Sequence, residues 1–359
     1  MLLKWCIFAK QMLFQFIYCF YYCLFSTKKT LLIIYSNSSM LYSNLKELEK
    51  SLEKYNIKYQ VIFNNKSINN IKYIANSSII IIDQSNYFLS YIKLFPSTKV
   101  LQLWHGGGLY KKVAFDKTFS LEDNKNITRI YRNISFLNIS DKKLVDDYSR
   151  MFNIHKENII NYGLPRTDRL FSRDTLKDKK EFLLMYPEIG SKKICLYAPT
   201  FREDAKQQRK LLKIEENMAE QLQDYIIIYR AHPTLKISDN VKGIIDVSNL
   251  ELDFVLSVSD ILISDYSSII FDYSFFKRPI VLYVPDLKEY FIKKKQLYFH
   301  PSELVGCSNV CYSSTELANV VKRATYEIDL WDSFMSNCKG NSCQQLVGFI
   351  KDLQIKGDV

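Results

Sequence analysis

Short apolar segments recur along the chain and alternate with longer polar ones. The apolar runs predict strands at Leu31–Tyr35, Ile79–Asp83, Val100–Trp104, Ile134–Ile139, Ile194–Ala198, Tyr225–Arg230, Asp260–Ser264 and Pro279–Val284. Several of them are apolar at every position, which is typical of parallel strands that helices cover on both faces. Between them, segments such as Asn44–Lys54 and Leu211–Gln223 carry apolar residues three and four positions apart and predict helices. This alternation predicts an α/β fold with parallel sheets.

The predicted strands fall into two series. The charged segment Phe171–Ser191, which contains Pro187 and Gly190, separates them. A chain of 359 residues is long enough for two domains. We therefore expect one α/β domain at residues 29–180, a second at 181–335, and a C-terminal helix within 336–359.

The first 28 residues need a separate explanation. The run Trp5–Phe25 is apolar and aromatic except for one Lys and two Gln, and no acidic residue precedes Glu47. The run lacks the small-residue cleavage site of a signal peptide, and its polar residues disfavour a membrane span. The pattern favours a membrane-associating segment at residues 1–28 that lies in the bilayer interface. The alternative is a buried N-terminal helix of the fold.

Composition narrows the class of protein. With 47% hydrophobic and 24% charged residues the chain is globular, and 49 Lys+Arg against 38 Asp+Glu give a net charge of +11. That charge suits nucleic acid, an anionic membrane or phosphorylated substrates. The eight cysteines form no C-x-x-C pair and the four histidines have no zinc-ligand spacing. We expect reduced thiols and no metal site.

Reactive side chains follow four predicted strands, at the sheet edge where α/β proteins bind ligands. They are His105 with Gly106, Gly107, Gly108, Lys111 and Lys112; Thr200 and Arg202; Arg230 and His232; and Asp265, Ser267 and Ser268. Arg, His and a helix start suit a pyrophosphate, and a His can accept a proton from a hydroxyl at neutral pH. Each group alone is equally compatible with a structural role such as a helix cap or surface ion pair.

A further turn, Gly163-Leu-Pro-Arg166-Thr-Asp168, carries an Arg that either reaches a ligand or pairs with the Asp to stabilise the turn. Motifs for dinucleotides, P-loop phosphates and a nucleophilic serine elbow are missing from the sequence. The remaining chemistry is a transfer without metal or cofactor, in which Arg, His and a helix end hold phosphate charge.

Taken in this order, five motifs resemble those of the CDP-glycerol glycerophosphotransferase family, the teichoic-acid primases and polymerases. The motifs are Trp104-His105-Gly106…Lys111-Lys112, Gly163-Leu-Pro-Arg166-Thr-Asp168, Tyr197-Ala-Pro-Thr-Phe-Arg202, Arg230-Ala-His232-Pro233 and Ser264-Asp265-Tyr-Ser-Ser268…Phe271-Asp272. The segment Lys277-Arg278-Pro279 and the apolar run after it are similar too. The resemblance covers the middle of the chain, from the first of these motifs to the last.

The resemblance implies a glycosyltransferase-B-like fold of two facing Rossmann-like domains. It implies attack of a glycan hydroxyl on the β-phosphate of CDP-glycerol, or a related CDP-alditol, with release of CMP. His105 would be the general base and Asp265 would orient its loop. The expected donor contacts are Arg166, Thr200, Arg202, Arg230, His232, Ser267 and Ser268, and the acceptor side would be Gly106, Gly107, Gly108, Lys111 and Lys112. The expected location is the cytoplasmic face of the cell membrane. An anionic membrane surface is the expected partner there, and nucleic acid is not expected as a partner.

One departure concerns the acceptor-facing loop: the family has a glycine where this chain has Ala114. The alditol, the acceptor and the choice among primase, polymerase and a transferase that modifies capsule or lipopolysaccharide stay open. Two other functions also stay open. One is a nucleotide-sugar-dependent glycosyltransferase on the same fold. The other is a non-catalytic basic protein that binds nucleic acid or anionic lipid.

Overall fold

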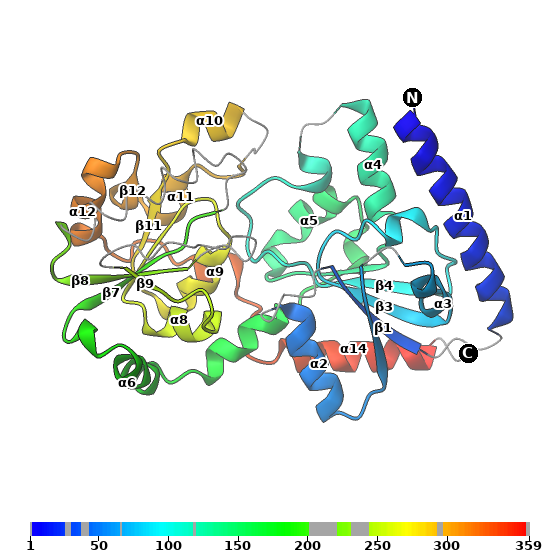
Figure 1. Cartoon of the computed structure of the whole chain (residues 1–359), viewed down its shortest axis with the longest axis horizontal. Helices are drawn as coiled ribbons and strands as arrows, with labels where there is room; N and C mark the ends of the chain where they lie inside the picture. Colours follow the sequence, from blue (N-terminus) through cyan, green and yellow to red (C-terminus); the bar gives the residue numbers. More distant parts are fainter. Residues whose placement is uncertain are drawn as a thin grey trace. The chain divides into compact units, whose positions relative to one another are not determined.

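A computed structural model describes residues 2–25, 30–36, 43–64, 67–117, 120–200, 221–230, 244–292 and 297–356. The chain forms two compact units, each built on its own sheet (Figure 1). The first unit comprises residues 1–106, 113–168 and 337–359, and the second comprises 107–112 and 169–336. The prediction of an α/β fold with two parallel-sheet domains is confirmed.

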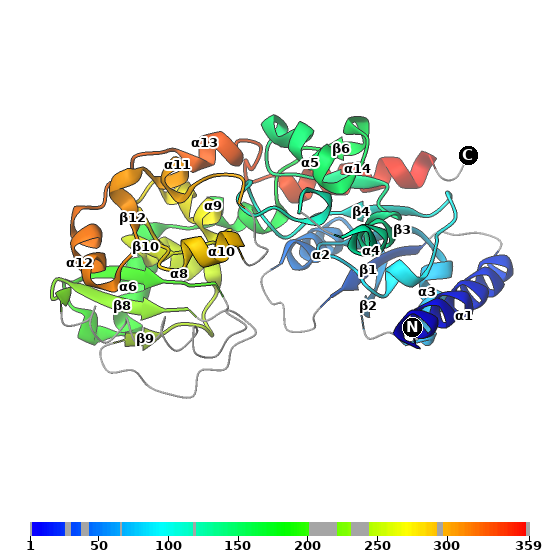
Figure 2. The same ribbon diagram turned by 90° about the horizontal axis from the view of Figure 1, so that it is seen from above.

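The first unit contains a six-stranded parallel sheet in the order β2-β1-β3-β4-β5-β6. The strands are β1 (Thr30–Tyr35), β2 (Tyr59–Phe63), β3 (Ser77–Ile82), β4 (Lys99–Gln102), β5 (Phe136–Asn138) and β6 (Ile159–Ile160). Helices α1 (Leu2–Leu24), α2 (Asn44–Lys54), α3 (Asn69–Ala75), α4 (Leu121–Tyr131), α5 (Val145–Phe152) and α14 (Ser342–Lys356) surround it (Figure 2).

Helices cover both faces of this sheet, which explains the runs of consecutive buried apolar residues in β1 and β3. In β1, Leu31 and Ile33 pack in one core cluster with leucines of α2 and with Leu346 of α14. Leu32 and Ile34 point to the opposite face, where they pack with residues of α1 and α3. The expected C-terminal helix is therefore part of the first unit's core.

One face of helix α1 packs into the core of the first unit, and the opposite face is exposed. Phe14 and Tyr18 are buried in the core cluster beneath the sheet, and the helix lies beside α3 (Figure 1). Among the described residues, no helix has the length and apolar character needed to cross a membrane. The alternative interpretation of the sequence, a buried N-terminal helix, is therefore correct for the face of α1 that carries Phe14 and Tyr18.

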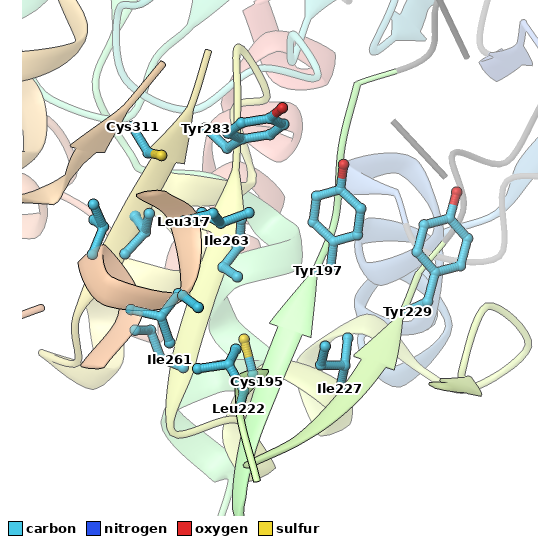
Figure 3. Close-up of a cluster of buried hydrophobic side chains, with 14 residues drawn as sticks. Cys195, Tyr197, Leu222, Ile227, Tyr229, Ile261, Ile263, Tyr283, Cys311 and Leu317 are labelled. Atoms are coloured by element: carbon cyan, nitrogen blue, oxygen red, sulfur yellow. The ribbon is translucent and has the colours of Figure 1, made fainter. Parts of the chain in front are cut away.

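The second unit contains a six-stranded parallel sheet in the order β12-β11-β10-β7-β8-β9. Its strands are β7 (Lys193–Tyr197), β8 (Tyr225–Tyr229), β9 (Ile244–Asp246), β10 (Ile261–Ser264), β11 (Ile280–Tyr283) and β12 (Val310–Cys311). Its helices are α6 (Thr175–Met185), α8 (Leu252–Val258), α9 (Ile269–Tyr273), α10 (Leu287–Ile292), α11 (Pro301–Val305), α12 (Ser314–Arg323) and α13 (Leu330–Phe334). Side chains of the central strands and α12 form the core shown in Figure 3.

The structure differs from the sequence expectation at the join. The charged segment Phe171–Ser191 was expected to link the domains, but it contains α6, which contacts α8 inside the second unit. Phe182 of α6 is fully buried, with its ring centroid 5.9 Å from that of Phe254. Phe182 is the apolar residue that anchors α6 in the second unit, while Leu176, Leu184 and Met185 of the same helix are exposed. The predicted helix Leu211–Gln223 lies mostly outside the described residues.

Candidate active site

His105 follows β4 on a strained piece of backbone. Trp104, the residue before it, has a φ of +51°, in the left-handed region that a bulky side chain rarely adopts. The His105 side chain is exposed, and its ring centroid lies 4.4 Å from that of the buried Trp104. His105 thus lies just beyond a strand end and its side chain is exposed, while its role as the base stays a prediction.

The backbone around His105 is bound by the nearby side chain of Gln102 and by side chains that are distant in sequence. The Gln102 Oε1 atom accepts from the Trp104 amide at 3.0 Å, and Asn44 Nδ2 donates to the Trp104 carbonyl at 2.5 Å. Arg166 Nη1 donates to the His105 carbonyl at 2.9 Å. Tyr148 adds a longer contact of 3.5 Å to the Gly106 carbonyl. The backbone at His105 is thus held by hydrogen bonds on successive groups.

Arg166 was expected to contact the donor. It is 5% exposed, and one of its guanidinium nitrogens is bound to the His105 carbonyl. Asp168, from the same turn, accepts from the amides of Ser342 and Cys343 at the start of α14, at 3.0 and 2.8 Å. In the described structure this turn therefore joins the His105 backbone to the C-terminal helix.

Asp83 is a buried carboxylate close to this network. It follows β3, is 2% exposed, and its Oδ2 atom has no hydrogen-bond partner among the described residues. Burial raises the pKa of Asp83 to about 6, while bonds from Leu45 and Ser43 and the charge of Arg166 act in the opposite direction. Asp83 is the last residue of a predicted strand, and none of the sequence motifs assigns a function to it.

The glycine-rich loop after His105 is divided between the units. Gly106 belongs to the first unit, and residues 107–112 belong to the second. There, Gly108 has a φ of +59° and packs against the ring of Phe271. The Tyr110 carbonyl accepts from the Tyr298 amide at 2.9 Å. Gly108, one of the glycines expected on the acceptor side, thus allows close packing within the second unit.

The two lysines of the loop are tied to the same unit. Lys111 pairs with Leu297 in a β-bridge, and Lys112 Nζ lies 5.8 Å from the centroid of the Tyr298 ring. Both side chains are half-buried. The loop residue Ala114, which lies in the first unit, has a φ of +47°, so its backbone adopts the conformation that glycine favours.

Asp265 connects two strand ends of the second unit. Its Oδ1 atom accepts from the amide of Thr200 at 2.9 Å, from the Thr200 hydroxyl at 2.5 Å and from the Tyr266 amide at 2.6 Å. Asp265 is 2% exposed. A buried carboxylate with three donors connects the loops after β7 and β10, and the part of Asp265 in the reaction stays a prediction.

The other expected donor contacts have different surroundings. Arg230 Nη1 donates to the carbonyls of Val247 and Leu250, at 3.2 and 2.7 Å. Ser267 accepts from the Ile269 amide at 3.3 Å, and Ser268 precedes α9 without capping it through its side chain. Both serines are half-buried. Arg202 and His232 lie outside the described residues.

Metal ligands are not gathered anywhere in the described parts of the chain: no three His, Cys, Asp or Glu side chains lie close enough together to hold an ion. The residues that sequence reasoning missed are Asn44, Gln102 and Tyr148. In the sequence, Asn44 is recognisable only as the first residue of a predicted helix, and Gln102 only as part of a predicted strand. The contacts of Asn44 with the Trp104 carbonyl and of Tyr148 with the Gly106 carbonyl arise only from the folded chain.

Comparison with known proteins identifies relatives over most of the chain. The family described as CDP-Glycerol:Poly(glycerophosphate) glycerophosphotransferase matches residues 21–347. A teichoic acid glycerol-phosphate primase of Bacillus subtilis is 32% identical over 295 residues, which are 77% of this chain and 74% of the relative. The teichoic acid ribitol-phosphate polymerase TarK of Staphylococcus aureus is 28% identical over 296 residues, 78% of this chain and 57% of the relative.

A solved structure agrees at the level of the fold. The wall teichoic acid polymerase TagF aligns with a TM-score of 0.78 and 22% identity, covering 99% of both chains. Together with the matches in sequence, this confirms the resemblance that the five motifs indicated. The chain therefore belongs to the CDP-glycerol:poly(glycerophosphate) glycerophosphotransferase family.

Proposed function

We propose that this protein transfers glycerol phosphate, or a similar alditol phosphate, from a CDP-activated donor to a hydroxyl of a lipid-linked surface glycan, releasing CMP. The match to the family over residues 21–347 supports the reaction class. The observation that carries the proposal is the exposed imidazole of His105 on a backbone held by Gln102, Asn44 and Arg166. A fixed, accessible imidazole suits a general base.

In the proposed reaction, the ring of His105 accepts the proton of the acceptor hydroxyl. The hydroxyl oxygen then forms a bond to the β-phosphorus of the donor. The bond between that phosphorus and the bridging oxygen breaks, and CMP leaves with the electron pair. A neutral imidazole has one ring nitrogen with a free lone pair, and this nitrogen can take the proton.

The donor's phosphates require positive charge and hydrogen-bond donors as the bridging bond breaks. We assign this task to Arg230 with Arg202 and His232, and to the hydroxyls of Ser267 and Ser268. Asp265 supports the arrangement indirectly, because it holds Thr200 and the Tyr266 amide on neighbouring loops. This division gives the second unit the donor and the first unit the base.

We also propose that α1 places the enzyme on the cytoplasmic face of an anionic membrane, where a lipid-linked acceptor is found. Nine residues between positions 8 and 24 are exposed, and Lys10 is the only polar one among them. The apolar ones include Phe8, Met12, Phe16 and Phe20, spaced four apart. An apolar stripe beside basic residues fits a helix lying in the bilayer interface.

The reaction is tested by measuring CMP release from CDP-glycerol and CDP-ribitol, and UDP release from UDP-sugars, with membranes that carry lipid-linked glycan acceptors. We expect acceptor-dependent CMP release from one CDP-alditol, and loss of about a thousandfold in His105→Ala with the donor still bound. His155→Ala is the matched control, because His155 is also exposed and its side chain caps no helix. UDP release with silence from both CDP-alditols would instead indicate a sugar transferase.

A further inference from the structure

The backbone from Trp104 to His105 is bound by three side chains of the first unit, one from the same strand end and two from parts of the chain about 60 positions away. Gln102 binds the Trp104 amide, Asn44 the Trp104 carbonyl and Arg166 the His105 carbonyl. This is the place where Trp104 has a φ of +51°. A bulky residue stays in that conformation only when its surroundings hold it there.

Asn44 is the central member of this set, because both ends of its amide are used. Its Nδ2 atom donates to the Trp104 carbonyl at 2.5 Å, and its Oδ1 atom accepts from the Arg166 amide at 3.1 Å. Asn44 thereby connects the strand end that carries His105 to the turn whose guanidinium binds the His105 carbonyl.

The position of Asn44 is itself well fixed. It is 1% exposed and is the first residue of α2. The Ser43 hydroxyl accepts from the Lys46 amide and so caps this helix, and Leu45 and Leu48 are fully buried in the core. A side chain on a capped and packed helix can hold a strained loop in one conformation.

We propose that Asn44 is a positioning residue for His105, an inference that rests on the proposed role of His105 as the base. Without the Asn44 amide, Trp104 is released toward an ordinary negative φ, and the backbone of His105 turns with it. The ring then no longer meets the acceptor hydroxyl in the geometry needed for proton transfer. Donor binding, which is assigned to the second unit, stays unchanged.

The test compares steady-state CMP release by wild type and Asn44→Ala in the full chain. We expect kcat to fall by about 100-fold, because a small misplacement of a reacting group has an effect of this size. The KM for the CDP-alditol should stay within about twofold of the wild-type value, because the substitution affects the chemical step and not donor binding. Asn44→Asp should lose as much, because its carboxylate can accept from Arg166 but cannot donate to the Trp104 carbonyl.

Asn70→Ala is the matched control for a merely structural effect. Asn70 is also a buried asparagine at the start of a helix, and its Nδ2 atom donates to the Phe63 carbonyl at 2.9 Å. We expect a similar fall in melting temperature in both variants but an unchanged kcat in Asn70→Ala. If the two variants lose activity together, in proportion to the folded fraction, the positioning role is excluded.

Two further variants keep the inference testable if Asn44→Ala folds poorly. Gln102→Met conserves side-chain volume but removes the acceptor for the Trp104 amide, and we expect the same loss of kcat at unchanged KM. In a His105→Ala background, Asn44→Ala should have no further effect on the residual rate, because residues that act through one group are not additive. A further loss in the double variant would show that Asn44 acts independently of His105.

The outcomes also separate this inference from the proposed function. Full activity in His105→Ala would remove His105 from the mechanism. An inactive His105→Ala beside an Asn44→Ala variant within about twofold of wild type in kcat would overturn only the positioning role.

Discussion

The aromatic ring of Phe271 occupies the space that a side chain at Gly108 would need. A β-carbon built on Gly108 would lie 2.4 Å from Phe271 Cε1, and the φ of this glycine is +59°. Gly108 therefore packs closely against Phe271, and both residues belong to the second unit.

Gly108→Ala should lower the free energy of unfolding by about 3 kcal/mol, because it adds steric overlap to backbone strain. Gly190→Ala is the control for strain alone, since Gly190 has a φ of +58° and a β-carbon at this position would have no atom within 4 Å. Its ψ of −127° lies outside the left-handed helical region, so we expect that control to lose about 2 kcal/mol from strain alone. Urea denaturation measures both, and equal losses would mean that the Phe271 contact is unimportant.

Ala114→Gly should stabilise the protein. Ala114 has a φ of +47°, where an alanine is strained and a glycine is not. The expected gain in the free energy of unfolding is about 1 kcal/mol. Ala318→Gly, in the middle of α12 (Ser314–Arg323), should instead lose about 1 kcal/mol. A loss in both variants would show that the backbone at Ala114 is not strained.

The sequence predicts the buried strands well because their signal is local. Strands β1, β3 and β11 each contain four consecutive buried apolar residues, and this pattern does not depend on the neighbouring strands. The edge strands escaped prediction for the opposite reason: β2 has mostly exposed or half-buried residues, and β12 contains only two residues. Such strands are defined by pairing with a neighbour and not by their own composition.

The same distinction explains the candidate site. His105 and Asp265 are recognisable because they stand in motifs at the ends of local apolar runs. Asn44 was not recognisable, since the backbone groups that it binds lie 60 and 122 positions away in the chain. Contacts of that separation follow from the arrangement of strands in the sheet, which a single sequence does not specify.

Arg230→Ala should weaken donor binding by about tenfold or more, the value of one charge-assisted contact to phosphate. The substitution also removes the hydrogen bonds from the Arg230 side chain to the carbonyls of Val247 and Leu250. The control must therefore be another arginine whose side chain donates to two backbone carbonyls. Arg278→Ala does so, because Arg278 Nη1 donates to the carbonyls of Ser257 and Ser259. Calorimetric titration with the CDP-alditol should detect weaker binding in Arg230→Ala alone. The same loss of affinity in Arg278→Ala would argue for an indirect, structural effect.

Asp83 should make stability depend on pH. Burial raises its pKa from 3.8 to about 6, so the folded state binds the proton more tightly than the unfolded chain. The stability that this group contributes is fully present below pH 4 and is lost as the pH rises through about 6. The loss is about 3 kcal/mol for a shift of about two pKa units.

Asp83→Asn cannot titrate and should therefore lack this dependence. Relative to wild type, its free energy of unfolding should rise by about 3 kcal/mol between pH 4 and pH 7 and then stay level up to pH 8. Urea denaturation at these three pH values measures the difference. A constant difference between pH 4 and pH 7 would show that Asp83 has an ordinary pKa in the folded protein.

The outward face of α1 gives the last prediction, the binding of lipid vesicles. Phe16 and Phe20 are 72% and 57% exposed on an otherwise apolar face. Replacing both by Ser should remove about 3 kcal/mol of burial in the bilayer interface, or about 100-fold in the partition coefficient. Co-sedimentation with vesicles containing anionic lipid measures it. Neutral vesicles should bind the wild type more weakly, because the segment before Glu47 carries lysines and no acidic residue.

The control for exposed apolar residues in general is Leu184→Ser with Met185→Ser, on α6 of the second unit, where the side chains are 84% and 45% exposed. This pair should leave vesicle binding unchanged. The alternative partner for the exposed face of α1 is a second copy of the chain, and sedimentation velocity without lipid tests for such a dimer. If wild type is a dimer that Phe16→Ser with Phe20→Ser dissociates, while vesicle binding is unaltered, then protein and not lipid covers this face.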